Sequence, residues 1–344
     1  MSGTTVFDGT ILRGREFEAI EGRVVVEDGE IVAVERQPTH SDSIVLPAFV
    51  NAHTHTGDSI AKEAGEGHSL EELVAPPDGL KHRLLRQASR EEKVAAMRRS
   101  LRFMESAGTA ACIEFREGGV AGVDAIEAAA EGLAVDPVVL GREAVEAMEA
   151  GDGFGASGAN DGDFSRERTA TARADKLFGI HAGEVDDSDI NSAMDLKPDF
   201  LVHMVHAADL HLERVADSEA PVVVCPRSNL VTGAGFPPIA DLVERTTVAL
   251  GTDNVFLNSP SMFREMEFTA KLADVSAREV LRMATVNGAE IAGLNCGLVE
   301  EGRDAALLVL DGDSDNLAGA ENAVRAVVRR AGVDDVAEVS LGED

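Results

Sequence analysis

Two histidines separated by a single residue end an apolar stretch near the N-terminus. Residues 46–55 read Leu-Pro-Ala-Phe-Val-Asn-Ala-His-Thr-His, so we expect a buried strand that ends at His53 and His55. Side chains two positions apart in a strand point to the same face, and two neighbouring imidazoles can supply half of a metal site. An isolated pair of this kind is more often two unrelated histidines in a loop, so the interpretation depends on the rest of the chain.

Three later strand-like segments also end in residues that could bind a metal or move a proton. The residues that stand at or just beyond these ends are His181, Glu184, His203, His206 and Asp253. Taken singly, each has an ordinary alternative, such as a histidine of the core or an aspartate that caps a helix. Taken together with the first pair, they are a ligand set for a divalent metal with an acid/base partner.

The elements that would position these residues alternate between strand and helix. The predicted strands cover residues 46–55, 109–115, 137–140, 153–158, 177–181, 200–205, 222–225 and 247–250. About eight strand–helix units in about 250 residues predict a (β/α)₈ TIM barrel, in which catalytic groups stand at the C-terminal ends of the strands. The main rival is an open doubly wound sheet, which the absence of a glycine-rich dinucleotide fingerprint in the first unit disfavours.

The two ends of the chain show a different sequence pattern, with short strands separated by turns. Strand runs are predicted at 23–26 and 31–34, and again at 305–310, 323–329 and 336–341. We therefore expect residues 1–45 and 300–344 to fold together as a small β-rich unit. Residues 46–299 would form the catalytic barrel. A Ser-x-x-Glu pattern at Ser89 and Glu92 predicts a capped helix start between the first two barrel strands.

The composition bounds the classes of protein to which the chain can belong. Its 344 residues carry a net charge of −31, with only six lysines among 31 basic residues. A dispersed acidic surface predicts adaptation to a cytoplasm of very high salt, as in halophilic archaea. An acidic surface for a basic partner is the alternative, and nucleic-acid binding is disfavoured because no basic stripe is present.

Cellular location is predicted from what the chain does not show. The first ten residues lack the pattern of a signal peptide, and no apolar run reaches the roughly 20 residues of a membrane helix. Cys112, Cys225 and Cys296 show no metal-binding spacing and fit core positions in a reducing environment. A cytoplasmic protein without membrane contact is expected.

These motifs resemble the amidohydrolase superfamily, in its cytosine deaminase and chlorohydrolase branch. The resemblance rests on the stretch at 46–55, His-Ala-Gly-Glu at 181–184, His-x-x-His at 203–206, Cys-Pro-Arg-Ser-Asn-Leu at 225–230, Leu-Gly-Thr-Asp-Asn at 250–254, Ala-Thr-Val-Asn-Gly-Ala at 284–289 and the run at 301–310. The matches cover nearly the whole chain in the expected order.

The resemblance implies a role for each candidate residue. His53, His55, His181 and Asp253 would bind one divalent metal, usually zinc and alternatively iron. His203 would polarise the group under attack, and Glu184 would shuttle a proton. The chain ends would form a composite β-sandwich, and the enzyme would be a homo-oligomer. Binuclear members carry a carboxylated lysine on the fourth strand, but residues 153–158 contain no lysine, which favours a mononuclear site.

Four further residues could contact the substrate or support the site. Arg116 follows the second strand and could clamp a carboxylate or phosphate, although a structural ion pair is the alternative. Arg227 and Asn229 follow the seventh strand and could line the pocket or only shape the loop. His206 could be a pocket residue or a hydrogen-bond partner of a ligand.

The predicted activity is hydrolysis of a small molecule. Deamination of an amino-substituted heterocycle, such as a purine or pyrimidine derivative, is the first expectation. Hydrolysis of a cyclic amide or of a carbon–halogen bond by the same site is the alternative, because these reactions differ only in the leaving group. A non-catalytic barrel scaffold would be marked by a missing ligand, and none is missing here.

Overall fold

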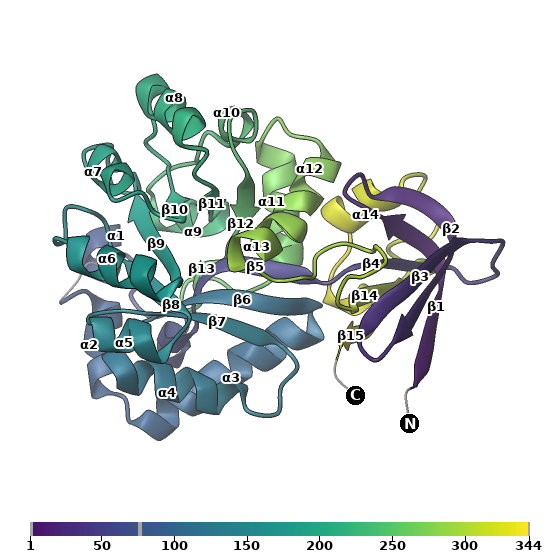
Figure 1. Cartoon of the computed structure of the whole chain (residues 1–344), viewed down its shortest axis with the longest axis horizontal. Helices are drawn as coiled ribbons and strands as arrows, with labels where there is room; N and C mark the ends of the chain where they lie inside the picture. The colour runs from purple at the N-terminus through teal and green to yellow at the C-terminus, as the bar shows by residue number, and fades with distance from the viewer. Residues whose placement is uncertain (1–2, 75–77, 343–344) are drawn as a thin grey trace.

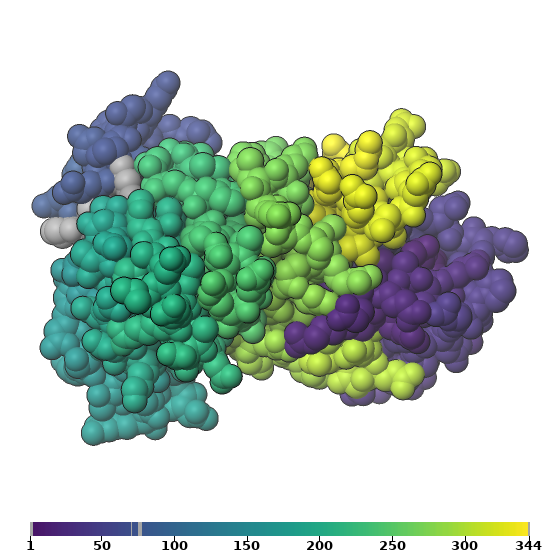
Figure 2. Space-filling view, turned by 90° about the horizontal axis from the view of Figure 1, so that it is seen from above, coloured from purple at the N-terminus to yellow at the C-terminus, as the bar shows by residue number. Residues whose placement is uncertain are grey.

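The computed structural model describes residues 3–74 and 78–342. It contains two β-sheets. A six-stranded sheet lies at one end of the molecule, and a curled nine-stranded sheet is surrounded by helices (Figure 1). In the space-filling view, the N-terminal segment in purple and the C-terminal segment in yellow pack together at the same end (Figure 2). The molecule is therefore an α/β protein with its chain ends joined in one sheet.

The six-stranded sheet is mixed and combines both ends of the chain. Its order is β15-β14-β4-β1-β2-β3. Its strands are β1 (Thr4–Arg13), β2 (Glu18–Glu27), β3 (Glu30–Arg36), β4 (Ser43–Pro47), β14 (Ala306–Asp311) and β15 (Val336–Leu341). Strands β1 and β4 pair in parallel and the other neighbours are antiparallel. The chain leaves β4 and enters the larger sheet almost at once, so the two sheets share a direct connection.

The terminal unit is one mixed six-stranded sheet built from both ends of the chain. Ile31 at the start of β3 donates its backbone N–H to the carbonyl of Arg303 at 2.9 Å, so the far edge of the sheet reaches back to the segment before β14. The curl encloses a small apolar core. Its members are Phe7, Ile11, Ile20, Val24, Val26, Ile31, Val45, Val299, Ala305, Leu307 and Val309.

One predicted terminal strand is wrong, because residues 323–329 form a helix. Helix α14 (Ala323–Arg329) begins at Asn322, whose side chain accepts a hydrogen bond from the Arg325 N–H. A polar cap of this kind favours a helix start. Buried valines at 324, 327 and 328 then follow helical spacing and join the main core. A run rich in valine fits both the period of a strand and the period of a helix, and the polar cap favours the helix.

The nine-stranded sheet is parallel throughout and supplies the strand ends at which the site lies. Its strands, in chain order, are β5 (Phe49–His55), β6 (Thr109–Arg116), β7 (Asp136–Gly141), β8 (Gly153–Ala156), β9 (Leu177–Ala182), β10 (Phe200–His203), β11 (Val222–Val224), β12 (Val248–Leu250) and β13 (Asp253–Asn254). Each of the eight predicted strands is present. The short β13 continues the direction of β12.

The sheet curls until its two ends meet. Strand β13 starts three residues after the end of β12 and pairs with β5, so that Asp253 lies opposite Thr54. Gly251 between them permits this approach, since a Cβ there would stand 2.7 Å from the His53 Cβ. The result is a TIM-barrel-like fold, and the meeting of the sheet's ends is not a feature of an open doubly wound sheet.

Helices cover the outside of the curled sheet. They are η1 (Thr56–Ala61), α1 (Leu70–Val74), α2 (Leu80–Gln87), α3 (Arg90–Ser106), α4 (Gly119–Ala130), α5 (Val145–Ala150), α6 (Ser165–Ala174), α7 (Ile190–Asp195), α8 (Asp209–Ser218), α9 (Pro226–Thr232), α10 (Ile239–Val243), α11 (Met262–Leu272), α12 (Ala277–Met283) and α13 (Val286–Ala292), with η2 (Val333–Asp335) near the C-terminus. The predicted capping box of α3 is confirmed at Ser89 and Glu92. In the described residues, no helix is both long enough and apolar enough to cross a membrane.

Candidate metal centre

The predicted ligands come together at one end of the curled sheet. His53 and His55 end β5, His181 lies near the end of β9, and Asp253 begins β13. The polar atoms of His53, His55 and His181 lie within 4.8 Å of one another, and those of His53, His203 and Asp253 do so as well. Four elements that are distant in the sequence therefore converge on one point, as the strand-end argument predicted.

The spacing of these atoms suits a single divalent ion. His53 Nε2 lies 3.4 Å and His55 Nε2 3.7 Å from Asp253 Oδ1. Two ligands bound at zinc distances in tetrahedral geometry stand about 3.4 Å apart. The separations in the structure match this value without movement of the backbone.

Hydrogen bonds orient two of the imidazoles toward the centre. His55 Nδ1 lies 3.1 Å from the carbonyl of Phe115 and 3.0 Å from Glu117 Oε1, and His181 Nδ1 lies 2.8 Å from the carbonyl of Ala156. Because these partners only accept, Nδ1 carries the hydrogen and Nε2 keeps its lone pair for a metal. His53 is fully buried, yet neither of its ring nitrogens has a hydrogen-bond partner. A buried imidazole without a partner is costly unless an ion binds it.

Burial and neighbouring charges keep these side chains in the protonation states that can bind a metal. Burial lowers the pKa of His53 and of His181, and burial together with the nearby Lys81 lowers the pKa of His55 to about 3. All three imidazoles are therefore neutral near pH 7. Burial opposes ionisation of Asp253, but the neighbouring histidines, His53 first among them, hold its pKa well below its usual value. Three neutral imidazoles and one carboxylate are a usual donor set for zinc.

Glu184 and His203 face each other beside this centre. Glu184 Oε2 lies 3.5 Å from His203 Nε2, and burial is the main cause of a raised pKa for Glu184. The backbone of His203 has a φ of 80° and that of Asp253 a φ of 55°. A left-handed conformation costs free energy in residues other than glycine, and such costs are concentrated at functional sites. Both residues are therefore held in place by their surroundings.

Asn229 and its neighbour Ser228 orient these groups from α9. Asn229 Nδ2 lies 3.1 Å from His203 Nδ1, and Ser228 Oγ donates to Asp253 Oδ2 at 2.6 Å. An amide nitrogen can only donate, so His203 Nδ1 accepts and Nε2 carries the hydrogen toward the site. Asn229 thus contacts the site through His203.

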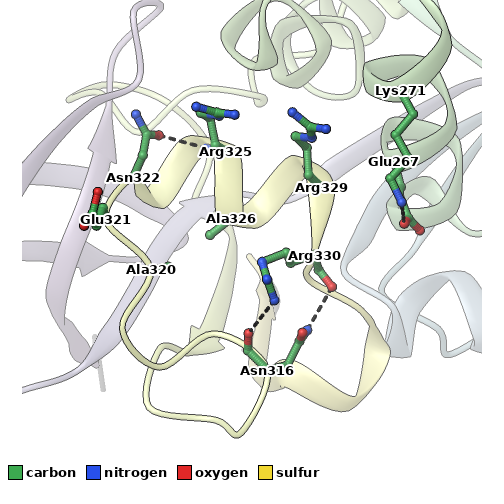
Figure 3. Close-up of a pocket in the computed structure, with 10 residues that line it drawn as sticks. All are labelled: Glu267, Lys271, Asn316, Ala320, Glu321, Asn322, Arg325, Ala326, Arg329 and Arg330. Atoms are coloured by element: carbon green, nitrogen blue, oxygen red, sulfur yellow. Dashed lines mark hydrogen bonds and ion pairs between the residues drawn. The ribbon is translucent and has the colours of Figure 1, made fainter.

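A cavity of about 490 Å³ opens over the cluster. Its lining includes His55, Lys81, His82, Arg142, Asp161, His181, Glu184, His203, Asp253 and Asn254. A larger groove of about 730 Å³ lies between α11 and α14, with Arg325 and Arg329 side by side above it (Figure 3). The groove has no cluster of metal-binding side chains among the described residues, so the chemistry belongs to the cavity over the histidines.

The structure does not bring Arg116 or Arg227 to the wall of this cavity. Arg116 is buried and pairs with Glu114 Oε1 at 2.8 Å and with Glu117 Oε2 at 2.6 Å. Arg227 pairs with Glu265 Oε2 at 3.0 Å and donates to the carbonyl of Ser259. These are the structural ion pairs of the alternative interpretation. A guanidinium after a strand can turn outward into the helix layer as readily as inward.

The sequence analysis did not identify two residues beside the metal centre, Lys81 and Glu117. Lys81 is buried, and its Nζ lies 2.9 Å from Glu117 Oε1 and 3.1 Å from Asn254 Oδ1. Burial opposes ionisation of Glu117, but Lys81, His55 and Arg116 hold its pKa well below its usual value. The only sequence signal was the rarity of lysine in this chain. Lys81 reaches the cavity from the first turn of α2.

Comparison with known proteins agrees with this geometry. The model of the amidohydrolase family matches residues 44–209 and 173–337. An uncharacterized protein of Methanocaldococcus jannaschii is 34% identical over 97% of each chain. A 5-methylthioadenosine/S-adenosylhomocysteine deaminase of Halobacterium salinarum is 29% identical over 92% of this chain and 86% of its own. The zinc complex of atrazine chlorohydrolase from Arthrobacter aurescens has a TM-score of 0.83 at 18% identity, over 98% and 94% of the two chains.

Proposed function

Because the chain belongs to the amidohydrolase family, we propose that its cavity hydrolyses a carbon–nitrogen bond and releases ammonia from an amino-substituted heterocycle. The observation that carries this proposal is the convergence of three neutral imidazoles, one ionised carboxylate and the Glu184–His203 pair on a single cavity. Deaminases among the relatives support the same reaction class.

The metal would be a single divalent ion held by His53, His55, His181 and Asp253. Zinc is the first expectation and iron the alternative, since both accept imidazole and carboxylate ligands. Such an ion would lower the pKa of a water molecule toward neutrality. A second ion is not expected, since β8 carries no lysine and Lys176 Nζ bonds to the carbonyls of Met148 and Glu149 instead.

The side chains supply the proton transfers. Asp253 is ionised and can accept a proton from the attacking water, while Ser228 holds its other oxygen. The raised pKa of Glu184 suits it to keep a proton and give it to the leaving nitrogen. His203 presents an Nε2 hydrogen to the group under attack, because Asn229 occupies its Nδ1. The protonated nitrogen then leaves as ammonia.

Two alternatives use the same site. A cyclic amide or a carbon–halogen bond could be hydrolysed there, and the triazine chlorohydrolase neighbour shares the fold. A non-catalytic scaffold is disfavoured because every predicted ligand stands in place. In each of these hydrolytic reactions, Arg116 and Arg227 would act on the substrate only indirectly.

The wider setting of the enzyme is also inferred. A cytoplasmic homo-oligomer that acts on a small molecule, with residues 46–299 as its catalytic part, fits the family relationship. The net charge of −31 supports adaptation to high salt. Neither nucleic acid nor a membrane is an expected partner.

Ammonia release tests the proposal. Zinc- or iron-loaded protein in concentrated KCl would be given amino-purines, amino-pyrimidines, their nucleosides and amino-triazines, with Asp253→Asn as the matched control. Release by the native chain and at least about 10³-fold less by the variant is expected, since the variant lacks a ligand and a base. If the folded, metal-loaded protein releases no ammonia from any amino substrate, hydrolysis of a cyclic amide or a halide becomes the proposed activity.

A further inference from the structure

The basic residues of this acidic chain are not evenly distributed. Eight of the 31 lysines and arginines, but only two of the 62 acidic residues, lie within residues 81–102, a stretch of net charge +6. This stretch forms α2 and most of α3, which lie at the edge of the molecule beside α4 (Figure 1). A concentration of positive charge on an otherwise acidic surface creates a local attraction for anions.

A second pocket lies against these helices, outside the catalytic cavity. It has a volume of about 430 Å³ and is bounded by α2, α3 and the first turns of α4. Leu85, Met97 and Ala125 give it a buried apolar floor. Arg86, Arg90 and Lys93 stand at its rim. An apolar floor with charged groups to one side is the usual construction of a small-molecule site.

The basic side chains at the rim keep donors for a ligand. Among the residues that the structure describes, Arg90 makes one hydrogen bond, from Nη2 to the carbonyl of Asp124 at 3.3 Å, although a guanidinium has five donors. Lys93 has no ion pair within the described ranges 3–74 and 78–342. Arg86 pairs with Asp78 at 3.3 Å. The rim therefore has unused positive charge.

The position of Arg90 and Lys93 on their helix is unfavourable for folding. Both lie in the first turn of α3, where the helix dipole disfavours a cation. Glu91 and Glu92 offset part of this cost. A role in folding does not explain why two cations occupy this turn on the side that faces the pocket. Binding of a ligand would explain their position.

The acids near the pocket are already engaged. Glu117 forms the back wall with Arg116, to which it is paired at 2.6 Å, and this pair separates the pocket from the metal ligand His55. Glu143 accepts the backbone N–H of Gly118 at 2.9 Å, at the start of α4. Neither carboxylate has an ion pair with Arg90 or Lys93.

We propose that this pocket binds a small organic anion, whose apolar body rests on Leu85, Met97 and Ala125 and whose charged group faces Arg90 and Lys93. The site is distinct from the metal centre. It does not depend on the reaction assigned to that centre, because it needs no metal, and the linings of the two cavities have His82 in common.

A pair of fluorescent probes tests this site by binding alone. The anion 8-anilinonaphthalene-1-sulfonate would be titrated against the full chain, and the uncharged N-phenyl-1-naphthylamine, with a similar ring body, against the same samples. The variant is Arg90→Gln with Lys93→Gln. The matched control is Arg99→Gln, an exposed arginine of the same helix that does not line the pocket. All titrations use the lowest KCl concentration at which circular dichroism shows each chain folded.

The expected result is saturable binding of the sulfonate by the native chain and a loss of affinity of at least about tenfold in the double variant. Binding of the neutral probe should change less than about twofold, and Arg99→Gln should bind both as the native chain does. The proposal is overturned if the native chain does not bind the sulfonate, if the double variant binds it equally well, or if both probes lose affinity in parallel.

Discussion

At the scale of single residues, Glu117 connects the metal centre to the charged groups around it. Its Oε1 lies 3.0 Å from His55 Nδ1, 2.9 Å from Lys81 Nζ and 3.3 Å from Arg142 Nη1. A carboxylate behind a metal-bound imidazole fixes the ring and raises its basicity. Glu117 is therefore a positioning residue, and it also offsets the charge of Lys81, whose Nζ lies 3.8 Å from Asp58 Oδ2 as well.

Glu117→Gln keeps the size of the side chain and removes its charge. We expect zinc affinity to fall about 10–100-fold, because His55 loses the carboxylate that orients it. The unfolding free energy should also fall by about 3–5 kcal/mol, as expected when one partner of a buried ion pair is removed. Chelator competition measures the first effect and thermal unfolding the second.

Glu143→Gln is the control for this substitution, since Glu143 is exposed, accepts a backbone N–H from Gly118 and does not line the catalytic cavity. An unchanged zinc affinity in Glu117→Gln, with the fold intact, would contradict the positioning role.

At the scale of elements, the ion pair of Arg227 and Glu265 joins α9 to α11. Burial raises the pKa of Glu265 to about 7 despite the opposing effect of Arg227. Glu265 therefore binds a proton more tightly in the folded chain than in the unfolded chain, where its pKa is near 4.5. Its contribution to stability is complete below that value and is lost as the pH rises through about 7.

Glu265→Gln should remove this dependence. Relative to the native chain, the variant is expected to gain about 1–3 kcal/mol of unfolding free energy between pH 5 and pH 8, since only the native chain then ionises a buried carboxyl. Comparing the two chains by denaturant unfolding cancels the titration of the histidines. Glu267→Gln, on the same helix but half exposed, should show no such trend, and a flat difference for Glu265→Gln would refute the argument.

Local patterns predicted most of the elements and most of the residues that gather at the candidate metal centre. The strands were readable because each is a short apolar run, and His53, His55, His181 and Asp253 stand where such runs end. The capping box of α3 was visible for the same reason, since it involves residues three apart. Helix α14 was misread because buried valines fit either period.

The surroundings of the ligands could not be predicted in the same way. Lys81 reaches the cavity only because α2 docks against the sheet end, and its partner Glu117 lies on another loop. Whether Arg116 faces substrate or pairs with Glu114 depends on which carboxylates fold beside it. These contacts are set by tertiary packing and leave no periodic signal in the sequence.

At the scale of the whole molecule, the net charge of −31 governs behaviour in dilute buffer. Repulsion among exposed carboxylates extends over about 10 Å at 0.1 M salt and about 3 Å at 1 M. The basic stretch at 81–102 leaves the remainder of the chain more acidic still. Salt should therefore stabilise the folded protein.

We expect the melting temperature to rise by at least about 10 °C between 0.1 M and 2 M KCl, equivalent to a few kcal/mol. NaCl should act similarly, because screening depends on ionic strength, whereas an equal osmolality of glycerol should not reproduce the effect. Differential scanning calorimetry across the salt series measures it. Full stability in dilute buffer would rule out the adaptation to high salt.

The pairing of β13 with β5 also bears on the order in which the enzyme is made. Thr54 donates its hydroxyl hydrogen to the carbonyl of Asp253, a residue 199 positions later in the chain. At ribosomal rates of about 5–20 residues per second, His53 and His55 emerge roughly 10–40 s before the aspartate that completes their set. During that interval the nascent chain offers a metal only part of a site. The full set of four side chains is therefore available only after strand β12 and Asp253 have left the ribosome.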